Sequence, residues 1–146
     1  MRMRPALALA LAGVVLVLAA CTALAAPDAD EAALMTLGRT LSQQFERGDL
    51  AAVLRRGSEP WRVGIGGPAG LAALRERVLR EDGPETGVIQ ETARREGSLG
   101  IYRRIARRNV GETPTLMEWT LDASSQIVAL EIRPQPTAIP SGKSGY

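Results

Sequence analysis

The spacing of apolar residues changes near residue 85, and this change constrains the fold more than any other feature of the chain. Before it, apolar residues such as Leu34, Leu41 and Phe45 recur at intervals that place them on one face of a helix. After it, apolar residues such as Met117 and Trp119 alternate with other residues, as is typical of strands. Helices followed by strands predict an α+β domain in which the helices cover one face of an antiparallel sheet.

Capping residues and prolines in the first half of the chain predict three helices. They are expected over residues 30–47 after a cap at Asp28 or Asp30, over a short segment after a cap at Asp49, and from Pro68 to Gly83. Residues 57–67, which are rich in glycine, are expected to form a loop between the second and third helices.

The second half of the chain predicts about four strands. They are expected over residues 86–95, 99–108, 116–121 and 127–133. Residues 122–126 contain the Asp and Ser that favour turns, so the last two strands are expected to form an antiparallel hairpin. The face that carries Trp119 and Leu130 is expected to pack against the helices.

The first 26 residues have the layout of a bacterial export signal. Arg2 and Arg4 precede an uncharged apolar run over residues 6–18, and small residues follow this run. Because positive charge holds the N-terminus of such a leader in the cytoplasm, the domain is expected on the outer side of the membrane.

Three outcomes of this leader remain open. Residues 18–21, Leu-Ala-Ala-Cys, resemble the lipobox of bacterial lipoproteins, in which cleavage between Ala20 and Cys21 makes Cys21 the lipidated N-terminus. Residues 23–25, Ala-Leu-Ala, fit cleavage by the ordinary signal peptidase. Residues 5–27 carry no charge and are long enough to span a bilayer if they are retained.

The expected layout is a signal peptide over residues 1–20, a tether over 21–29, one domain over 30–134 and a flexible tail over 135–146. The 18 basic residues less the two in the leader leave 16, which equals the 16 acidic residues. The basic character of the chain therefore belongs to the leader and does not predict a nucleic-acid partner. The chain has no histidine and one cysteine, which excludes histidine-based catalysis, His-ligated zinc and thiolate clusters.

Two segments resemble the nuclear-transport-factor-2-like superfamily. Residues 45–53, Phe-Glu-Arg-Gly-Asp-Leu-Ala-Ala-Val, resemble its helix–Gly-Asp–helix entry, and residues 119–134 resemble the final hairpin of a bacterial branch of unknown function. The resemblance implies a cone-like fold, in which a bent sheet wraps around three helices and encloses a pocket. Some members of the superfamily are ketosteroid isomerases, scytalone dehydratase or polyketide cyclases, and others only bind ligands or dimerise.

Carboxylates and tyrosine are the side chains left for acid–base chemistry. A glutamate buried in an apolar pocket has a raised pKa and can move a proton. Glu91 is the carboxylate whose side of the sheet the alternation leaves undecided. We take Trp61, Glu91, Tyr102 and Arg103 as the candidate lining of a ligand pocket, and we assign no residue as catalytic.

Three arginine pairs lie in the expected strands: Arg94-Arg95, Arg103-Arg104 and Arg107-Arg108. Neighbours in a strand point to opposite faces, so the pairs cannot form one basic stripe. Arg104 and Arg108 share a face with Tyr102, and they are expected to pair with Glu118 across the sheet. The arginines predict either a charge-paired, solvated sheet surface or an anion site at the mouth of the cone.

These features predict an exported envelope protein that is anchored through acylated Cys21 and carries a non-catalytic domain for binding a ligand or a protein. In bacterial lipoproteins, an Asp directly after the lipidated cysteine marks retention in the inner membrane. This chain has Thr22 at that position, so its resemblance to lipoproteins indicates the periplasmic side of the outer membrane. Ordinary cleavage would instead give a soluble periplasmic or secreted protein. The alternatives are a small lyase or isomerase that uses a pocket carboxylate and tyrosine, and a structural protein with no open pocket.

The partners considered are the membrane, a small anionic ligand, another envelope protein and a second copy of the chain. Neither a metal ion nor an organic cofactor is expected, because the residue types and motifs that would hold one do not occur in a suitable pattern.

Overall fold

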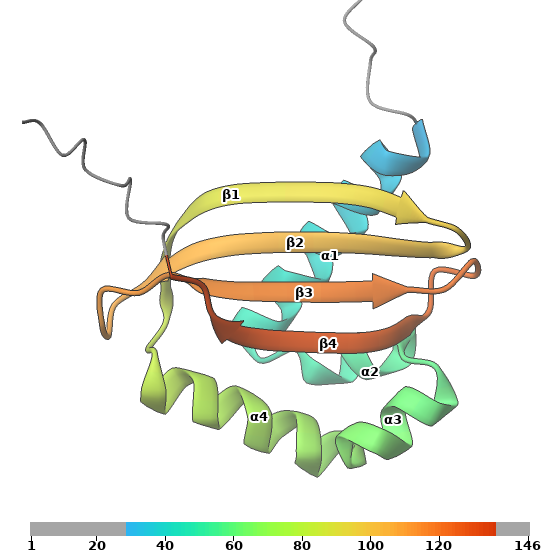
Figure 1. The fold of residues 1–146 in the computed structure, drawn as a ribbon. Helices are drawn as coiled ribbons and strands as arrows, with labels where there is room; N and C mark the ends of the chain where they lie inside the picture. Colours follow the sequence, from blue (N-terminus) through green and yellow to red (C-terminus); the bar gives the residue numbers. More distant parts are fainter. Residues whose placement is uncertain (1–28, 137–146) are drawn as a thin grey trace, which may run out of the picture.

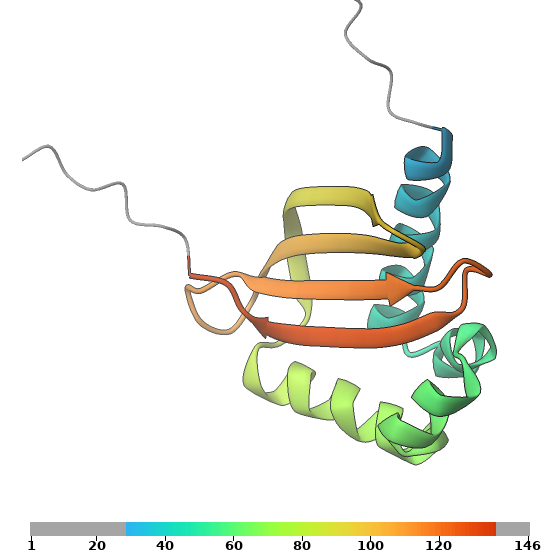
Figure 2. The same cartoon turned by 45° about the vertical axis from the view of Figure 1, so that its right-hand side comes forward.

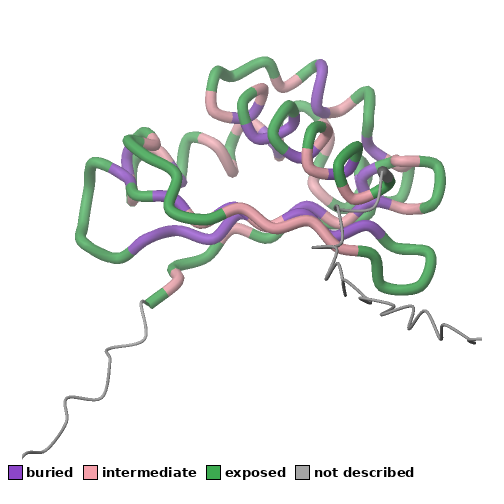
Figure 3. The backbone as a smooth tube through the Cα atoms, turned by 90° about the horizontal axis from the view of Figure 1, so that it is seen from above, coloured by how far each residue is buried: buried purple, intermediate pink, exposed green. Residues whose placement is uncertain are grey.

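Four helices precede a four-stranded sheet in the computed structural model, which describes residues 29–136. The elements are α1 (Ala29–Arg47), α2 (Leu50–Arg56), α3 (Glu59–Ile65), α4 (Gly67–Glu81), β1 (Glu85–Glu96), β2 (Leu99–Arg108), β3 (Thr115–Leu121) and β4 (Ile127–Pro134). The strands pair antiparallel in the order β1-β2-β3-β4, and the helices lie on one side of the sheet (Figure 1 and Figure 3). The α+β class is therefore confirmed, whereas the signal peptide, Cys21 and residues 137–146 lie outside the described residues.

The number of helices differs from the expected three, because residues 59–65 form α3 instead of a loop. The Ser58 side chain accepts a hydrogen bond from the Trp61 amide at 3.4 Å, and a proline lies in the first turn. Gly66 ends α3 in the left-handed conformation, at φ 87°, and is also the cap of α4. A Cβ on Gly70 would lie 1.7 Å from the Ile65 carbonyl oxygen, so a glycine there lets α3 and α4 meet at a sharp corner.

The sheet is bent where β1 passes β2. The pairing of β1 with β2 shifts register between Glu85 and Gly87 and again between Val88 and Gln90. Such bulges bend a strand and increase its twist, and Figure 2 shows the first part of β1 turning away from the rest of the sheet.

A third register shift changes which residues of β4 are buried. Leu130 pairs with Trp119 and lies on the helix-facing side, as expected. Between Thr120 and Leu121 the register slips by one residue, so that Leu121 pairs with Ile127. Ile127 is therefore fully buried and Val128 is 37% exposed, although strict alternation with Leu130 predicts the reverse.

The core lies between α1 and the centre of the sheet. Trp119 and Tyr102 are fully buried, and the ring of Phe45 contacts that of Trp119 edge-on at 6.5 Å. Gly38 of α1 lies directly against the Tyr102 ring, since a Cβ on Gly38 would be 2.1 Å from the ring carbon Cγ. This close approach lets α1 cross the sheet in contact with the central strands, and the prediction that the Trp119 face packs on the helices is confirmed.

The turns and helix ends agree in part with the capping signals. Oδ1 of Asp122 accepts hydrogen bonds from the amides of Ser124 and Gln126, each at 2.9 Å, in the expected turn before β4. Asp49 lies at the N-cap of α2, but its side chain makes no capping hydrogen bond, so that predicted contact is wrong. No helix within residues 29–136 is both long enough and apolar enough to cross a membrane.

Candidate functional site

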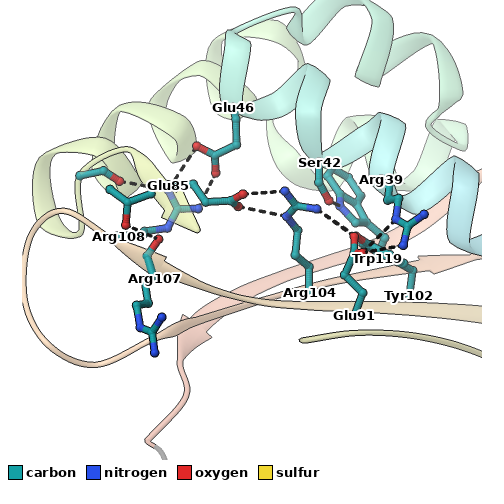
Figure 4. Close-up of polar contacts among 12 residues, drawn as sticks. Arg39, Ser42, Glu46, Glu85, Glu91, Tyr102, Arg104, Arg107, Arg108 and Trp119 are labelled. Carbon is teal, nitrogen blue, oxygen red and sulfur yellow. Dashed lines mark hydrogen bonds and ion pairs between the residues drawn. The ribbon is translucent and has the colours of Figure 1, made fainter. Parts of the chain in front are cut away.

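Side chains from α1, β1 and β2 meet at the carboxylate of Glu91, on the helix-facing side of the sheet (Figure 4). The Tyr102 hydroxyl donates a hydrogen bond to Oε1 of Glu91 at 2.5 Å. Arg39 of α1 donates from Nε and from Nη2 to Oε2, each at 2.9 Å. The Glu91 side chain is only 14% exposed, so these contacts replace most of its hydration.

Arg104 connects Glu91 to a second carboxylate, that of Glu85. Its Nη1 donates to Oε1 of Glu91 at 2.9 Å, and its Nε and Nη2 donate to the two oxygens of Glu85 at 3.0 and 2.5 Å. Such a two-point contact holds both groups in one orientation. We call Arg39, Glu85, Glu91, Tyr102 and Arg104 the inner network, which ties β1, β2 and α1 together.

The contacts of the inner network hold Glu91, Tyr102 and Arg104 in their ordinary charge states at neutral pH. Burial raises the pKa of the Glu91 carboxyl, but hydrogen bonds from Arg39 and Tyr102 and the neighbouring positive charges outweigh it and hold the pKa below its usual value. Burial and the bond to Glu91 raise the pKa of Tyr102 to about 12. Burial lowers the pKa of Arg104, but its bonds to Glu85 and Tyr102 more than offset this, so the net pKa is raised.

These shifts oppose proton transfer between Glu91 and Tyr102. A general acid or base works best when its pKa lies near the operating pH, whereas the two pKa values here move away from neutrality in opposite directions. The arrangement therefore stabilises the fold: at neutral pH the ionised Glu91 carboxylate accepts hydrogen bonds from donors that keep their protons.

A second charged pair fills the other end of the same face. Arg108 donates from Nη2 and Nη1 to the two carboxylate oxygens of Glu46 at 2.5 and 3.3 Å, and Nη1 also donates to the Gly83 carbonyl at 3.0 Å. Beside Glu91 and Tyr102 of the inner network, Nε1 of Trp119 donates to Oγ of Ser42 at 3.0 Å (Figure 4). These contacts fill part of this face, and a hollow of 280 Å³ lined by Glu46, Glu85 and Arg104 remains beside them.

The four residues expected to line a pocket are not brought together. Glu91 and Tyr102 touch, as described above. Arg103 lies on the opposite face of the sheet, because neighbouring residues of β2 point in opposite directions. Trp61 of α3 is 8% exposed and belongs to the hydrophobic core.

The expected partners of the arginines also require correction. Glu118 lies opposite Arg103 in the register of β2 and β3, and Nε of Arg103 donates to Oε2 of Glu118. The prediction that Arg104 and Arg108 pair with Glu118 is therefore wrong, since Glu118 lies on the other face.

The outer face of the sheet, which points away from the helices, carries charged side chains that form ion pairs with one another. Its ion pairs are Arg94–Glu96, Arg103–Glu118 and Arg133–Glu131. A groove of 480 Å³ crosses this face over Ile105 and Leu116, with Arg94, Arg103 and Arg133 along it. Because each of these arginines already contacts a glutamate, the arrangement agrees with the interpretation as a charge-paired surface.

Sequence reasoning did not find Arg39, Glu46 and Glu85. A signal was present in α1, because Arg39, Ser42 and Glu46 are spaced three and four residues apart and therefore share one side of the helix. That side faces the strand that carries Arg104 and Arg108. For Glu85, the bulge at the start of β1 hides the pairing from any alternation pattern.

Comparisons of the chain with protein-family models, curated proteins and solved structures found no match. The resemblance to the nuclear-transport-factor-2-like superfamily therefore stays a prediction. Within residues 29–136, no three potential metal-ligating side chains lie together.

Proposed function

We propose that this chain is an exported envelope protein, anchored through acylated Cys21 on the periplasmic side of the outer membrane, whose domain binds a ligand or a protein without catalysis. The export signal, the lipobox-like residues 18–21 and Thr22 support the location. Three acyl chains on the new N-terminus would make the anchor stable, because each buried methylene contributes roughly 0.8 kcal/mol and two chains already suffice.

The saturation of Glu91 is the observation that carries the non-catalytic part of this proposal. A lyase or isomerase of the expected kind needs a carboxylate that can take up and release a proton within an open pocket. Glu91 instead accepts hydrogen bonds from Arg39, Tyr102 and Arg104 beside a packed core. This favours a domain that presents its surface to a partner or ligand.

The anchoring is tested by the intact mass of the chain extracted from membranes. We expect an N-terminus at Cys21 that carries three acyl chains, and no acylated species from a Cys21→Ser chain. A mass that begins at Ala26, or one that retains Met1, would contradict the lipid anchor.

The binding proposal is tested by native mass spectrometry of the same material after gentle extraction. A retained small molecule or a co-purifying envelope protein is the expected result. A bare monomer that stays bare after incubation with envelope lipids and envelope extract would favour the structural alternative instead.

A further inference from the structure

A pocket of 440 Å³ lies at the end of the sheet where α1 begins, outside the inner network. We call it the rim pocket. It is lined by the first half of α1, the end of α2, the end of β1 and the turn between β3 and β4, all of which Figure 1 shows at one end of the molecule. Its volume falls within the range of about 300–1,000 Å³ that is typical of small-molecule sites.

The floor of the rim pocket is apolar. Leu34 and Leu121 form part of it and are only 5% and 2% exposed, and Leu37 packs beside them. The hydroxyls of the lining residues Thr36 and Thr40 already donate to backbone carbonyls of α1, at 3.1 and 3.0 Å. The floor therefore offers apolar contact to the chain of a ligand and few free hydrogen-bonding groups.

Two guanidinium groups, those of Arg56 and Arg95, line the pocket above this floor. Within residues 29–136, neither forms an ion pair or a side-chain hydrogen bond. The Nη1 atom of Arg95 lies 3.6 Å from the point where a Cβ on Gly100 would be, and the Leu34 methyl groups lie beside the same point. A positive charge thus lies next to apolar surface.

The two carboxylates of the rim pocket are already engaged. Oδ1 of Asp122 accepts the amides of Ser124 and Gln126, at 2.9 Å each, and Asp30 also has an interaction of its own. The hydrogen-bonding capacity that remains in the pocket is therefore mainly that of guanidinium donors, which match carboxylate and phosphate oxygens.

We propose that the rim pocket binds an amphipathic anion, with the alkyl chain on the leucine floor and the acidic head against Arg56 and Arg95. A fatty acid and a lysophospholipid share this chemistry. The inference deepens the binding function proposed above and rests on it, but the site does not require the lipid anchor.

Photo-crosslinking tests the site in the full chain, in phosphatidylcholine nanodiscs. The probe is dodecanoate with a diazirine at the end of its chain, and mass spectrometry locates the labelled peptides. We expect labels on peptides that contain Leu34 or Leu121. Excess dodecanoate or dodecyl phosphate should remove the label. Stronger competition by dodecanoate would indicate that the natural ligand is a fatty acid, and stronger competition by dodecyl phosphate would indicate a lipid with a phosphate head. Equal competition by dodecyltrimethylammonium or dodecyl maltoside would overturn the anionic preference.

Variants separate the charge from the cavity. Arg56→Gln and Arg95→Gln should each weaken competition by dodecanoate about fivefold, and the double variant about 20-fold, as expected for solvent-accessible charge pairs. Arg55→Gln and Arg94→Gln are the matched controls and should leave it unchanged, because these residues do not line the pocket.

A bulky residue at Ala33, which lines the pocket and is exposed, should abolish the label. The variant is Ala33→Trp, and Ala73→Trp on the exposed side of α4 is its control. Labels that map elsewhere, or competition by dodecanoate that is unchanged in the double arginine variant, would refute the site even if Cys21 is acylated. Chemical conversion of the probe would instead contradict the non-catalytic proposal.

Discussion

Replacing Glu91 with glutamine tests whether the inner network braces the fold. Glutamine keeps the shape of the side chain and one acceptor for Tyr102, but it removes the charge that holds Arg104 and Arg39. A hydrogen bond to a charged group contributes about 1.5–3 kcal/mol to stability. Because Arg104 is 10% exposed and retains Glu85, we expect a loss of about 2–3 kcal/mol, which is less than the roughly 3–5 kcal/mol that breaking a fully buried pair costs.

The effect of Glu91→Gln should depend on pH. Because the folded state lowers the pKa of Glu91, the carboxylate stabilises the fold above its unfolded pKa of about 4.3. This stabilisation is lost as pH falls through the folded pKa, where the wild-type carboxylate takes up its proton. The difference between wild type and variant should therefore be largest near pH 7 and should shrink in acid.

Urea unfolding of the full chain, followed by circular dichroism at pH 7 and at pH 3, measures this difference. Glu131→Gln is the matched control, because Glu131 pairs with Arg133 on the outer face and both side chains are about half exposed. It should change the free energy of unfolding by less than about 1 kcal/mol at either pH. If Glu91→Gln behaves like Glu131→Gln, the reasoning about the inner network is wrong.

Four further predictions concern Tyr102, Gly38, Gly64 and Ser42. In a Tyr146→Phe background, the phenol absorbance of Tyr102 should not titrate below about pH 12. The raised pKa implies about 2–3 kcal/mol of stability, which is present below pH 10 and lost between about pH 10 and 12. Titration near pH 10 while the chain stays folded would contradict this. Gly38→Ala should destabilise the fold by about 1–3 kcal/mol, because the added methyl group would overlap the buried Tyr102 ring. Gly64→Ala places its methyl group in open space within a helix, so it should stabilise the fold by up to about 1 kcal/mol. Thermal melts measure both changes. Ser42→Ala leaves a buried indole N–H without its acceptor and should lower the free energy of unfolding by about 1–3 kcal/mol; no change in urea unfolding would show that another acceptor replaces it.

Local signals predicted most of the elements. The period of apolar residues gave the order of helices and strands, and β2 begins and ends where the alternation predicts. The error at α3 arose because Gly64, Gly66 and Gly67 suggested a loop, although Ser58 and the proline after it form a helix start. In that segment two glycines end or begin helices instead of breaking one.

The candidate site was predicted only in part. Of the residues taken as the lining of one pocket, Glu91 and Tyr102 are in contact, but Arg103 lies on the other face of the sheet. Alternation within β2 separates Arg103 from Tyr102, yet only the register between strands shows that Glu118 lies opposite Arg103. Contacts of this kind depend on how one strand slides against another, which short-range patterns do not encode.

The amino-acid sequence by itself determined the fold class, the element order and the segments that are apolar on one side, because these depend on interactions between residues a few positions apart. The tertiary structure decided which charges meet. Arg39 and Glu91 are 52 residues apart, and Arg108 and Glu46 are 62 apart. Both pairs require the approach of α1 to the sheet, which is close at Gly38 and exists only once the chain is folded.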